Sequence, residues 1–479
     1  MSTAPAIIWF RQDLRTQDNP ALNAAYEYSK PVIPVYIYDE DAAGDWAFGG
    51  AAKWWLHRSL EKLKENLSGH LILRKGNALD ELQDLIETTG ADTVYWNRCY
   101  EPWRIKRDMD IKKTLKDMDL NVQSFNGCLL YEPQNVLKDD GTPYLVYTPF
   151  FKNACLKKNG DPPKPSPRPE RLTYGDDNVK GLEINNLGLL PDHDWYQKLE
   201  QYWTPGEDGA ATRLDDFLDG ALSRYDKGRD RPDKAGTSRL SPHLHWGEIS
   251  PREVWHAVRA RQQAENIGKD AETFLSELGW REFSYNLLYH FPDFPDKNHK
   301  DKFDAFPWEK DDDALQKWNW GKTGYPIVDA GMRQLYEEGW MHNRVRMIVG
   351  SFLVKDLRIH WLDGEKWFWD CLVDADLASN SAGWQWVAGC GADAAPYFRI
   401  FNPVRQSEKF DPNGDYIRHY VPELKNLDKK HIHAPWDAPD DVLDKAGITL
   451  GEDYPKPMVD HSEERDKALK AFQSIKDAA

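Results

Sequence analysis

Two sets of residues at helical spacing combine an indole ring with polar or charged side chains. Glu277 and Trp280 are three positions apart, so a helix would place both on one face. A second stripe, at spacings of three and four, mixes an indole, an amide, a guanidinium and a thioether in Trp340, Asn343, Arg344 and Met347. A stripe that only packs in a core would be apolar. A cavity wall and a structural helix face are both open interpretations, and spacing alone does not separate them.

A third group joins two acids and an amide to two tryptophans. Asp374, Asp376 and Asn380 lie only a few positions before Trp384 and Trp386. Carboxylates and an amide can hydrogen-bond a polar ligand while the rings cover its planar part. The group therefore suggests a ligand held against aromatic planes.

Hydroxyl side chains and an arginine gather just before a helical segment, at Thr237, Ser238, Arg239, Leu240 and Ser241. Hydroxyls, backbone N–H groups and a guanidinium can hold a pyrophosphate. Helix capping is the alternative interpretation, because serine and threonine commonly cap helices. The group is a weak signal when it is taken alone.

Tryptophan is unusually abundant, with 21 residues in a chain of 479. Many of them lie after residue 240 in polar surroundings. Tryptophan usually fills cores and interfaces. In a helical region, this many indole rings indicates stacking on a planar ligand or the transfer of electrons, with core filling as the competing interpretation.

The overall charge argues against a generally basic nucleic-acid binder. The formal net charge is -17 and the sequence pI is near 5.3. The stretch from Arg224 to Arg239 is locally basic, although a solvated loop is its ordinary interpretation. No apolar run is long enough for a membrane span, no secretory signal is evident, and no residues have metal-site spacing. These features predict a cytoplasmic protein without a metal ion.

Apolar segments alternate with helical patterns in the first part of the chain. Strands are expected over 7–10, 32–38, 71–75, 93–97 and 121–125, and helices over Ala51–Leu67 and Leu79–Thr88. This alternation predicts a doubly wound parallel sheet. No G-x-G-x-x-G or P-loop motif follows the first strand, so a nucleotide site of those kinds is not supported.

Helical spacing replaces this alternation from about Asp194. Helices are expected over Ala211–Tyr225, Pro251–Gln263, Ala271–Tyr289, Ile327–Gly339, Met341–Asp356 and Gly364–Leu372. The stretch Lys157–Arg171 is rich in proline and charge, which is typical of a linker. We therefore expect an α/β domain over 1–130, an interdomain linker over 131–193 and a large all-helical domain over 194–479.

Longer motifs along the whole chain resemble the photolyase/cryptochrome family, and most closely its bacterial cyclobutane-dimer photolyases. They begin at Trp9–Arg15 and end at Lys409–Asp411. The most specific stretches are Gly324–Ala330, Gly339–Met347, Gly383–Trp386 and Phe398–Pro403. They are long and occur in order, so chance similarity is not a serious competitor.

This resemblance implies that the helical domain binds FAD in a folded form. Positions that match phosphate-contacting residues are Tyr225, Thr237, Ser238, Arg239, Leu240 and Ser241. Positions that match residues around the flavin ring and ribose are Asn343, Arg346, Asp374, Ala375, Asp376 and Asn380. Asn380 would lie at the flavin N5, where an amide can bond without supplying a ready proton. Such a contact suits a flavin that works as the fully reduced anion.

The resemblance also implies light-driven repair of pyrimidine dimers by electron transfer. Trp384, Trp361 and Trp308 match the family's electron-transfer chain between the flavin and the surface. Excited reduced flavin would give one electron to the dimer and recover it after the ring bonds break. No net redox change occurs, and neither a metal nor a general base is needed, because the cofactor carries the chemistry.

The substrate residues are implied in the same way. Positions that match the dimer pocket are Glu277, Trp280, Asn343, Met347 and Trp386, and positions that match DNA contacts are Arg229, Arg344 and Gln406. Photolyases are a known case of base flipping, and a flipped base stacked on an aromatic ring gains roughly 1–3 kcal/mol. Glu277 can also steady charge on the dimer radical. Phosphate contacts from a local basic face make binding salt-dependent.

Two related activities compete with this interpretation. Enzymes that repair (6-4) photoproducts use a histidine pair, whereas this chain has His342 followed by Asn343, which favours the cyclobutane dimer. Plant-type cryptochromes carry an acid where Asn380 stands and usually a long signalling tail, whereas here a charged helical stretch follows Leu424. Repair therefore ranks above a blue-light receptor without repair activity. The stretch Leu377–Ala382 departs slightly from the usual family pattern, which leaves the geometry of Asn380 open.

A second, light-harvesting chromophore is expected in the first domain. Ala51–His57 and Tyr100–Glu101 are consistent with methenyltetrahydrofolate, with deazaflavin and FMN as alternatives. The expected partner is damaged DNA that contains pyrimidine dimers, and the chain is expected to act as a monomer.

Overall fold

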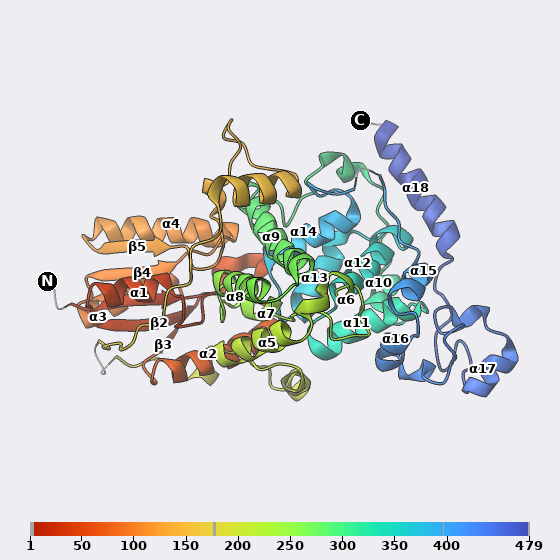
Figure 1. Ribbon diagram of the computed structural model, residues 1–479, viewed down its shortest axis with the longest axis horizontal. Helices are drawn as coiled ribbons and strands as arrows, with labels where there is room; N and C mark the ends of the chain where they lie inside the picture. The colour runs from red at the N-terminus through yellow and green to blue at the C-terminus, as the bar shows by residue number, and fades with distance from the viewer. Residues whose placement is uncertain (1–3, 176–178, 396, 478–479) are drawn as a thin grey trace. The chain divides into compact units, whose positions relative to one another are not determined.

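The computed structural model describes residues 4–175, 179–395 and 397–477, drawn in Figure 1. The chain divides into two compact units. Unit 1 contains Met1–Ser223, Ser238–Pro292 and Val373–Ala378. Unit 2 contains Arg224–Thr237, Asp293–Leu372 and Ser379–Ala479. Each unit is therefore assembled from separate stretches of sequence.

A parallel five-stranded sheet in the order β3-β2-β1-β4-β5 forms the first part of unit 1. The strands are β1 (Ala6–Phe10), β2 (Val32–Tyr38), β3 (Ile72–Lys75), β4 (Thr93–Asn97) and β5 (Asn121–Phe125). β1, β2 and β4 are buried throughout, which explains their nearly continuous apolar sequences. The helices between strands are α1 (Pro20–Glu27), α2 (Gly50–Asn66), α3 (Ala78–Thr89) and α4 (Pro102–Asp117). The predicted doubly wound sheet is confirmed.

The rest of unit 1 contains helices joined by irregular and extended stretches. Its main helices are α5 (Glu207–Asp219), α7 (Ser241–His245), α8 (Pro251–Ala264) and α9 (Gly268–His290). A π-type helix, η3 (Pro149–Asn159), lies between β5 and α5 in the chain. α8 begins at a capping box, in which the Ser250 hydroxyl accepts from Glu253 N while the Glu253 carboxylate accepts from Ser250 N.

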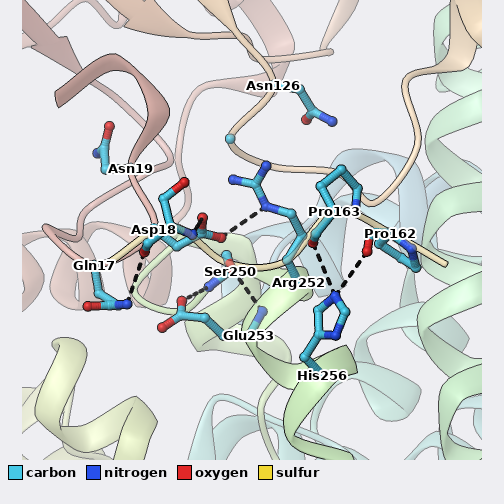
Figure 2. Close-up of polar contacts among 12 residues, drawn as sticks. Gln17, Asp18, Asn19, Asn126, Pro162, Pro163, Ser250, Arg252, Glu253 and His256 are labelled. Carbon is cyan, nitrogen blue, oxygen red and sulfur yellow. Dashed lines mark hydrogen bonds and ion pairs between the residues drawn. The ribbon is translucent and has the colours of Figure 1, made fainter. Parts of the chain in front are cut away.

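The predicted linker Lys157–Arg171 includes the end of η3 and an extended segment held by hydrogen bonds (Figure 2). The His256 ring nitrogen Nε2 lies 2.9 Å from the carbonyl oxygen of Pro162. Ser166 N donates to Asp18 Oδ1 at 2.8 Å, and Arg252 Nε donates to Asp18 Oδ2 at 3.0 Å. These contacts fasten the proline-rich segment to α8 and to the loop after β1. The predicted domain boundaries themselves stay a prediction.

Helices also make up unit 2, as expected for the second part of the chain. They are α6 (Tyr225–Gly228), α10 (Asp312–Asn319), α11 (Pro326–Glu338), α12 (Asn343–Ser351), α13 (Trp361–Cys371), most of α14 (Leu377–Ala388), α15 (Pro403–Phe410), α16 (Asp415–Tyr420), α17 (Asp440–Ala446) and α18 (His461–Asp477). In the part of the chain that the structure describes, no helix is both long and apolar enough to span a bilayer.

Several helix ends differ from the sequence-based expectations. The helix expected over 211–225 starts earlier, at Glu207, and ends before Gly220, after which short turns lead to Tyr225. The helix expected over 341–356 starts at Asn343 and continues as a π-type turn, η8 (Phe352–Asp356). Histidine rings cap α12 and α13: His342 accepts from Arg344 N, and His360 accepts from Leu362 N. Histidine is not among the usual capping residues, so these starts lacked the ordinary sequence signal.

Candidate functional site

The carboxylate of Asp376 lies in a buried polar network in unit 1. The Tyr285 hydroxyl donates to Asp376 Oδ2, and His245 Nδ1 lies 3.5 Å from the same oxygen. Burial alone would raise the pKa of this carboxyl, but His245, Arg281 and the Tyr285 hydroxyl together lower the pKa well below its ordinary value. Asp376 therefore stays anionic and can accept hydrogen bonds from a ligand.

Most of the hydroxyl cluster, Ser238–Ser241, belongs to unit 1 and ends at the first residue of α7. Arg239 has a left-handed backbone with φ of 53°, a strained conformation for a residue with a side chain. Its guanidinium lies 4.6 Å from the centre of the Trp203 ring. Ser238 Oγ accepts from Leu240 N at 3.3 Å, and Ser241 is exposed. The strained turn thus presents hydroxyls and N–H groups beside a fixed guanidinium.

Trp280 is half-buried on α9, and one face of its ring is covered. Tyr147 stacks on it with ring centres 3.8 Å apart and an interplanar angle of 8°. The Tyr147 hydroxyl donates to Ser276 O at 2.7 Å, which fixes the ring. Gly279 makes room for this arrangement, because a Cβ there would lie 2.7 Å from the Phe151 ring. We call Trp280 with Tyr147, Phe151 and Gly279 the Trp280 face.

α14 presents a stripe of small and polar residues in unit 2. Ser379 and Gly383 are exposed and Asn380 is half-buried, whereas Ser381 and Trp384 are buried. No atom lies within 4 Å of the position that a Cβ at Gly383 would occupy. The Asn380 amide donates to Glu365 O at 3.2 Å, so its own oxygen can still accept from a ligand. The stripe therefore leaves open space at Gly383, where a ligand ring could approach the helix backbone.

At the start of α12, Asn343 is exposed and several charged groups surround His342. Burial, together with nearby guanidinium groups, lowers the pKa of His342 to about 4 even though Asp230 opposes this shift. His342 is therefore neutral at pH 7 and able to accept from Arg344 N. Arg344 pairs with Asp230 at 2.6 Å and lies 3.7 Å from the sulfur of Met347.

The three tryptophans of the predicted electron chain all belong to unit 2. Gly364 leaves space for the Trp384 ring, because a Cβ at Gly364 would overlap it. Gly364 lies one helical turn after Trp361 on α13, so Trp384 packs on the face that carries Trp361. The His360 ring contacts both Trp361 and Trp308, with ring centres 5.5 Å and 4.8 Å apart. Trp384 and Trp361 are buried, and Trp308 is half-buried.

Trp386 is half-buried near the end of α14, and a cation covers its ring. The Arg399 guanidinium lies 5.5 Å from the ring centre and donates to the Tyr397 hydroxyl at 2.7 Å. The preceding residue, Gln385, donates to Phe294 O at 2.6 Å and to Lys297 O at 2.9 Å. We call Trp386 with Tyr397 and Arg399 the Trp386 face.

Comparison with known proteins identifies the family. The model of the FAD binding domain of DNA photolyase matches residues 274–474, and the DNA photolyase model matches residues 6–170. A deoxyribodipyrimidine photo-lyase of Agrobacterium fabrum is 53% identical over 99% of both chains. This chain belongs to the photolyase/cryptochrome family. The predicted resemblance is confirmed.

Solved structures and plant relatives of the family agree with this assignment. A bacterial class III photolyase from Agrobacterium tumefaciens superimposes with a TM-score of 0.94 at 52% identity, covering 100% of this chain and 98% of that one. Cryptochrome-1 of Arabidopsis thaliana is 38% identical over 98% of this chain and 70% of its own length. The two-part fold of an α/β sheet and a helical remainder is the fold of this family.

Within each unit, the photolyase-family structure brings some of the predicted residues together. Arg344 contacts Met347, α14 carries Asn380, Trp384 and Trp386, and α9 carries Glu277 and Trp280. Of the remaining predicted residues, Tyr225 is buried with the Arg229 guanidinium beside its ring, and Arg346 donates to Met341 O. Gln406 lies on α15. Asp374 and Ala375 are buried next to Asp376 in the sequence. Their binding roles stay predictions.

Three contacts were missed by the sequence analysis. Tyr147 and Arg399 cover the two tryptophans, and Trp318 packs against Trp384 with ring centres 6.0 Å apart. Tyr147 contacts α9 across 129 positions of sequence, beyond any helical or strand periodicity. Arg399 lies inside the motif Phe398–Pro403, so only that motif could have drawn attention to it.

Proposed function

We propose that this photolyase-family chain uses light and reduced FAD to split cyclobutane pyrimidine dimers in DNA. The observation that carries the proposal is the 53% identity, over 99% of both chains, with a protein named deoxyribodipyrimidine photo-lyase. The presence of Asn380, with an amide rather than an acid, supports repair over a receptor that only signals.

The donor sets described above suit FAD. In unit 2, the amides of Asn343 and Asn380 and the open stripe at Gly383 suit a ring with both N–H donors and carbonyl acceptors. In unit 1, the anionic Asp376 can accept from an N–H donor. The hydroxyls beside Arg239 match a pyrophosphate. When bound in its reduced form, the flavin supplies light absorption and one electron for the dimer. The protein's own groups hold it, exclude water and keep Asp376 charged.

The proposed substrate contacts come from the two tryptophan faces. Tyr147 covers one side of Trp280, and Arg399 covers Trp386, so each indole is fixed before a base arrives. Each indole would stack on a base of the flipped dimer, and Glu277 and Asn343 would bond to base edges. Arg229, Arg344 and Gln406 would meet the DNA backbone. The acidic net charge of -17 is compatible with this, since only a local surface would contact phosphates.

Trp384, Trp361 and Trp308 are proposed to carry electrons that keep the flavin reduced. Trp384 is buried against Gly364 of α13, and the His360 ring contacts both Trp361 and the half-buried Trp308. Closely spaced rings let an electron pass in short steps. Replacing Trp308 with phenylalanine should slow photoreduction of oxidised FAD and leave repair by chemically reduced enzyme unchanged.

We propose methenyltetrahydrofolate as the second chromophore, with deazaflavin and FMN as alternatives. Planar ligands of doubly wound sheets often bind where the strand order reverses, here at the ends of β1 and β4. At the end of β1, the Arg11 guanidinium lies 4.4 Å from the centre of the buried Trp9 ring. The stretches Ala51–His57 and Tyr100–Glu101 are consistent with folate. Absorption spectra of chromophore released from purified protein distinguish the three.

One assay tests the proposed function directly. Purified protein is reduced, mixed with an oligonucleotide that contains thymine dimers and illuminated, and the recovery of intact thymines is measured. Recovery that requires both light and reduction supports the proposal. Flavin binding without any recovery would instead favour the cryptochrome-type receptor.

A further inference from the structure

The Phe398 ring in unit 2 is held between a helix and a buried amine. Phe472 of α18 stacks on it with ring centres 4.3 Å apart and an interplanar angle of 5°. Lys355 Nζ lies 3.3 Å from the centre of the same ring. A ring stacked this closely leaves no space for an amine on its own side, so the two groups cover opposite faces of Phe398.

The same amine also fixes the end of α14. Lys355 is buried, and its Nζ donates to Ala388 O at 2.5 Å, two residues after Trp386. Gly389 follows with φ of 97°, and a Cβ there would lie 3.4 Å from Phe303 and 3.7 Å from Phe398. The turn after α14 is thus enclosed by the groups that hold Phe398.

Phe398 directly precedes Arg399, the residue that covers Trp386. Beyond Arg399, Phe401 N donates to Ser351 Oγ at 3.2 Å. Residues 397–401 form no helix or strand, so contacts with other segments set their position. The anchors are Phe398 on one side of Arg399 and Phe401 on the other.

Ion pairs and buried apolar residues attach α18 to the rest of unit 2. His461 pairs with the buried Asp356, and Glu464 pairs with Arg358. Ala468 and Ile475 are buried on the same helix. Ion pairs and apolar burial together hold the helix so that Phe472 meets Phe398.

We propose that α18 is a positioning element for the substrate site: Phe472, acting through Phe398, holds the Arg399 guanidinium over Trp386 before DNA binds. This inference rests on the proposed role of Trp386 in stacking on the dimer. Without Phe472, residues 397–401 become ordered only when DNA binds, and the entropic cost weakens binding. Phe472 itself contacts neither base nor cofactor in this proposal.

The test uses the FAD-loaded full-length protein and compares Phe472→Ala with Leu469→Ala. Leu469 lies on the same helix and is 37% exposed, so its truncation leaves the Phe398 stack intact. Dissociation constants are measured for oligonucleotides with and without a thymine dimer, alongside FAD content and melting temperature. Phe472→Ala should weaken dimer binding by about 10-fold and change binding of undamaged DNA little, whereas Leu469→Ala should match the parent.

A double-mutant cycle with Arg399→Gln tests the route of the effect. If Phe472 acts through Arg399, the double variant loses little more dimer affinity than Arg399→Gln alone. Additive losses, an unchanged dimer affinity in Phe472→Ala, or equal losses of FAD, undamaged-DNA binding and dimer binding would each overturn the proposal. A parent protein that does not prefer dimer-containing DNA would instead contradict the proposed function. The two failures are therefore distinguishable.

Discussion

The Trp280 face and the Trp386 face present the same side chain with different support. Trp280 lies in the middle of the 23-residue helix α9, and a neutral ring covers it by stacking. Trp386 lies near the end of α14, and a guanidinium from an irregular segment covers it. The orientation of Trp280 depends on close packing of neighbouring rings, whereas the orientation of Trp386 depends on contacts from several separate segments. Two indoles proposed for one task thus have different weak points.

The largest expected difference is the response of stability to pH. Two residues after Trp280 on α9, burial raises the pKa of Glu282 to about 7. Below pH 4.5 both the folded and unfolded states hold this proton, but between 4.5 and about 7 only the folded state does. Stability is therefore lost as pH rises through this window, by at most about 3 kcal/mol. Glu282→Gln should flatten this slope in chemical denaturation measured across the window.

For Lys355, next to the Trp386 face, stability changes with pH in the opposite direction. Burial lowers the pKa of Lys355 well below its ordinary value. The unfolded chain then binds a proton that the folded chain lacks, so this group destabilises the fold as pH falls below the ordinary lysine pKa. Lys355→Met should remove that loss of stability on the acid side. Equal slopes for parent and variant would show that Lys355 is charged in the folded protein.

Truncation of each indole measures the two faces directly. Trp280→Ala and Trp386→Ala should each weaken binding of dimer-containing DNA by about 5- to 150-fold, since stacking is worth roughly 1–3 kcal/mol per base. Binding to undamaged DNA is the control. A variant that binds and repairs dimers as well as the parent would remove that tryptophan from the proposed site.

Gly279→Ala sharpens the comparison by disturbing only the tightly packed face. The added methyl group would lie 2.7 Å from three atoms of the Phe151 ring. Overpacking of this kind costs about 1–3 kcal/mol, so the melting temperature should fall. Gly268→Ala, at the start of the same helix α9, is the matched control, because no atom lies within 4 Å of its added methyl group. A parent-like melting temperature for Gly279→Ala would mean that Phe151 moves aside without cost.

The sequence predicted β1, β2 and β4 because each is a short buried run, and it predicted β3 and β5 from their alternation with helical segments. It predicted the helical second part from its 3.6-residue spacing. It could not predict that the side chains of His342 and His360 cap the N-termini of α12 and α13. Trp280 and Trp386 were found through spacing and motifs that lie within one helix each. Tyr147 and Arg399, which cover the two rings, were missed because they lie outside those helices. The spacing of residues within one helix does not indicate contacts with residues elsewhere in the chain.

The smallest expected effect concerns Tyr147 and separates its ring from its hydroxyl. Tyr147→Leu removes the stack on Trp280, and an aromatic pair is worth about 0.5–1.5 kcal/mol. Dimer affinity should therefore fall roughly 2- to 10-fold, because Trp280 loses its preset orientation. Tyr147→Phe keeps the ring and loses only the hydrogen bond to Ser276, so its affinity should stay within about 2-fold of the parent. If both variants lost affinity equally, the hydroxyl rather than the stack would orient Trp280, and the Trp280 face would then depend on a polar anchor as the Trp386 face does.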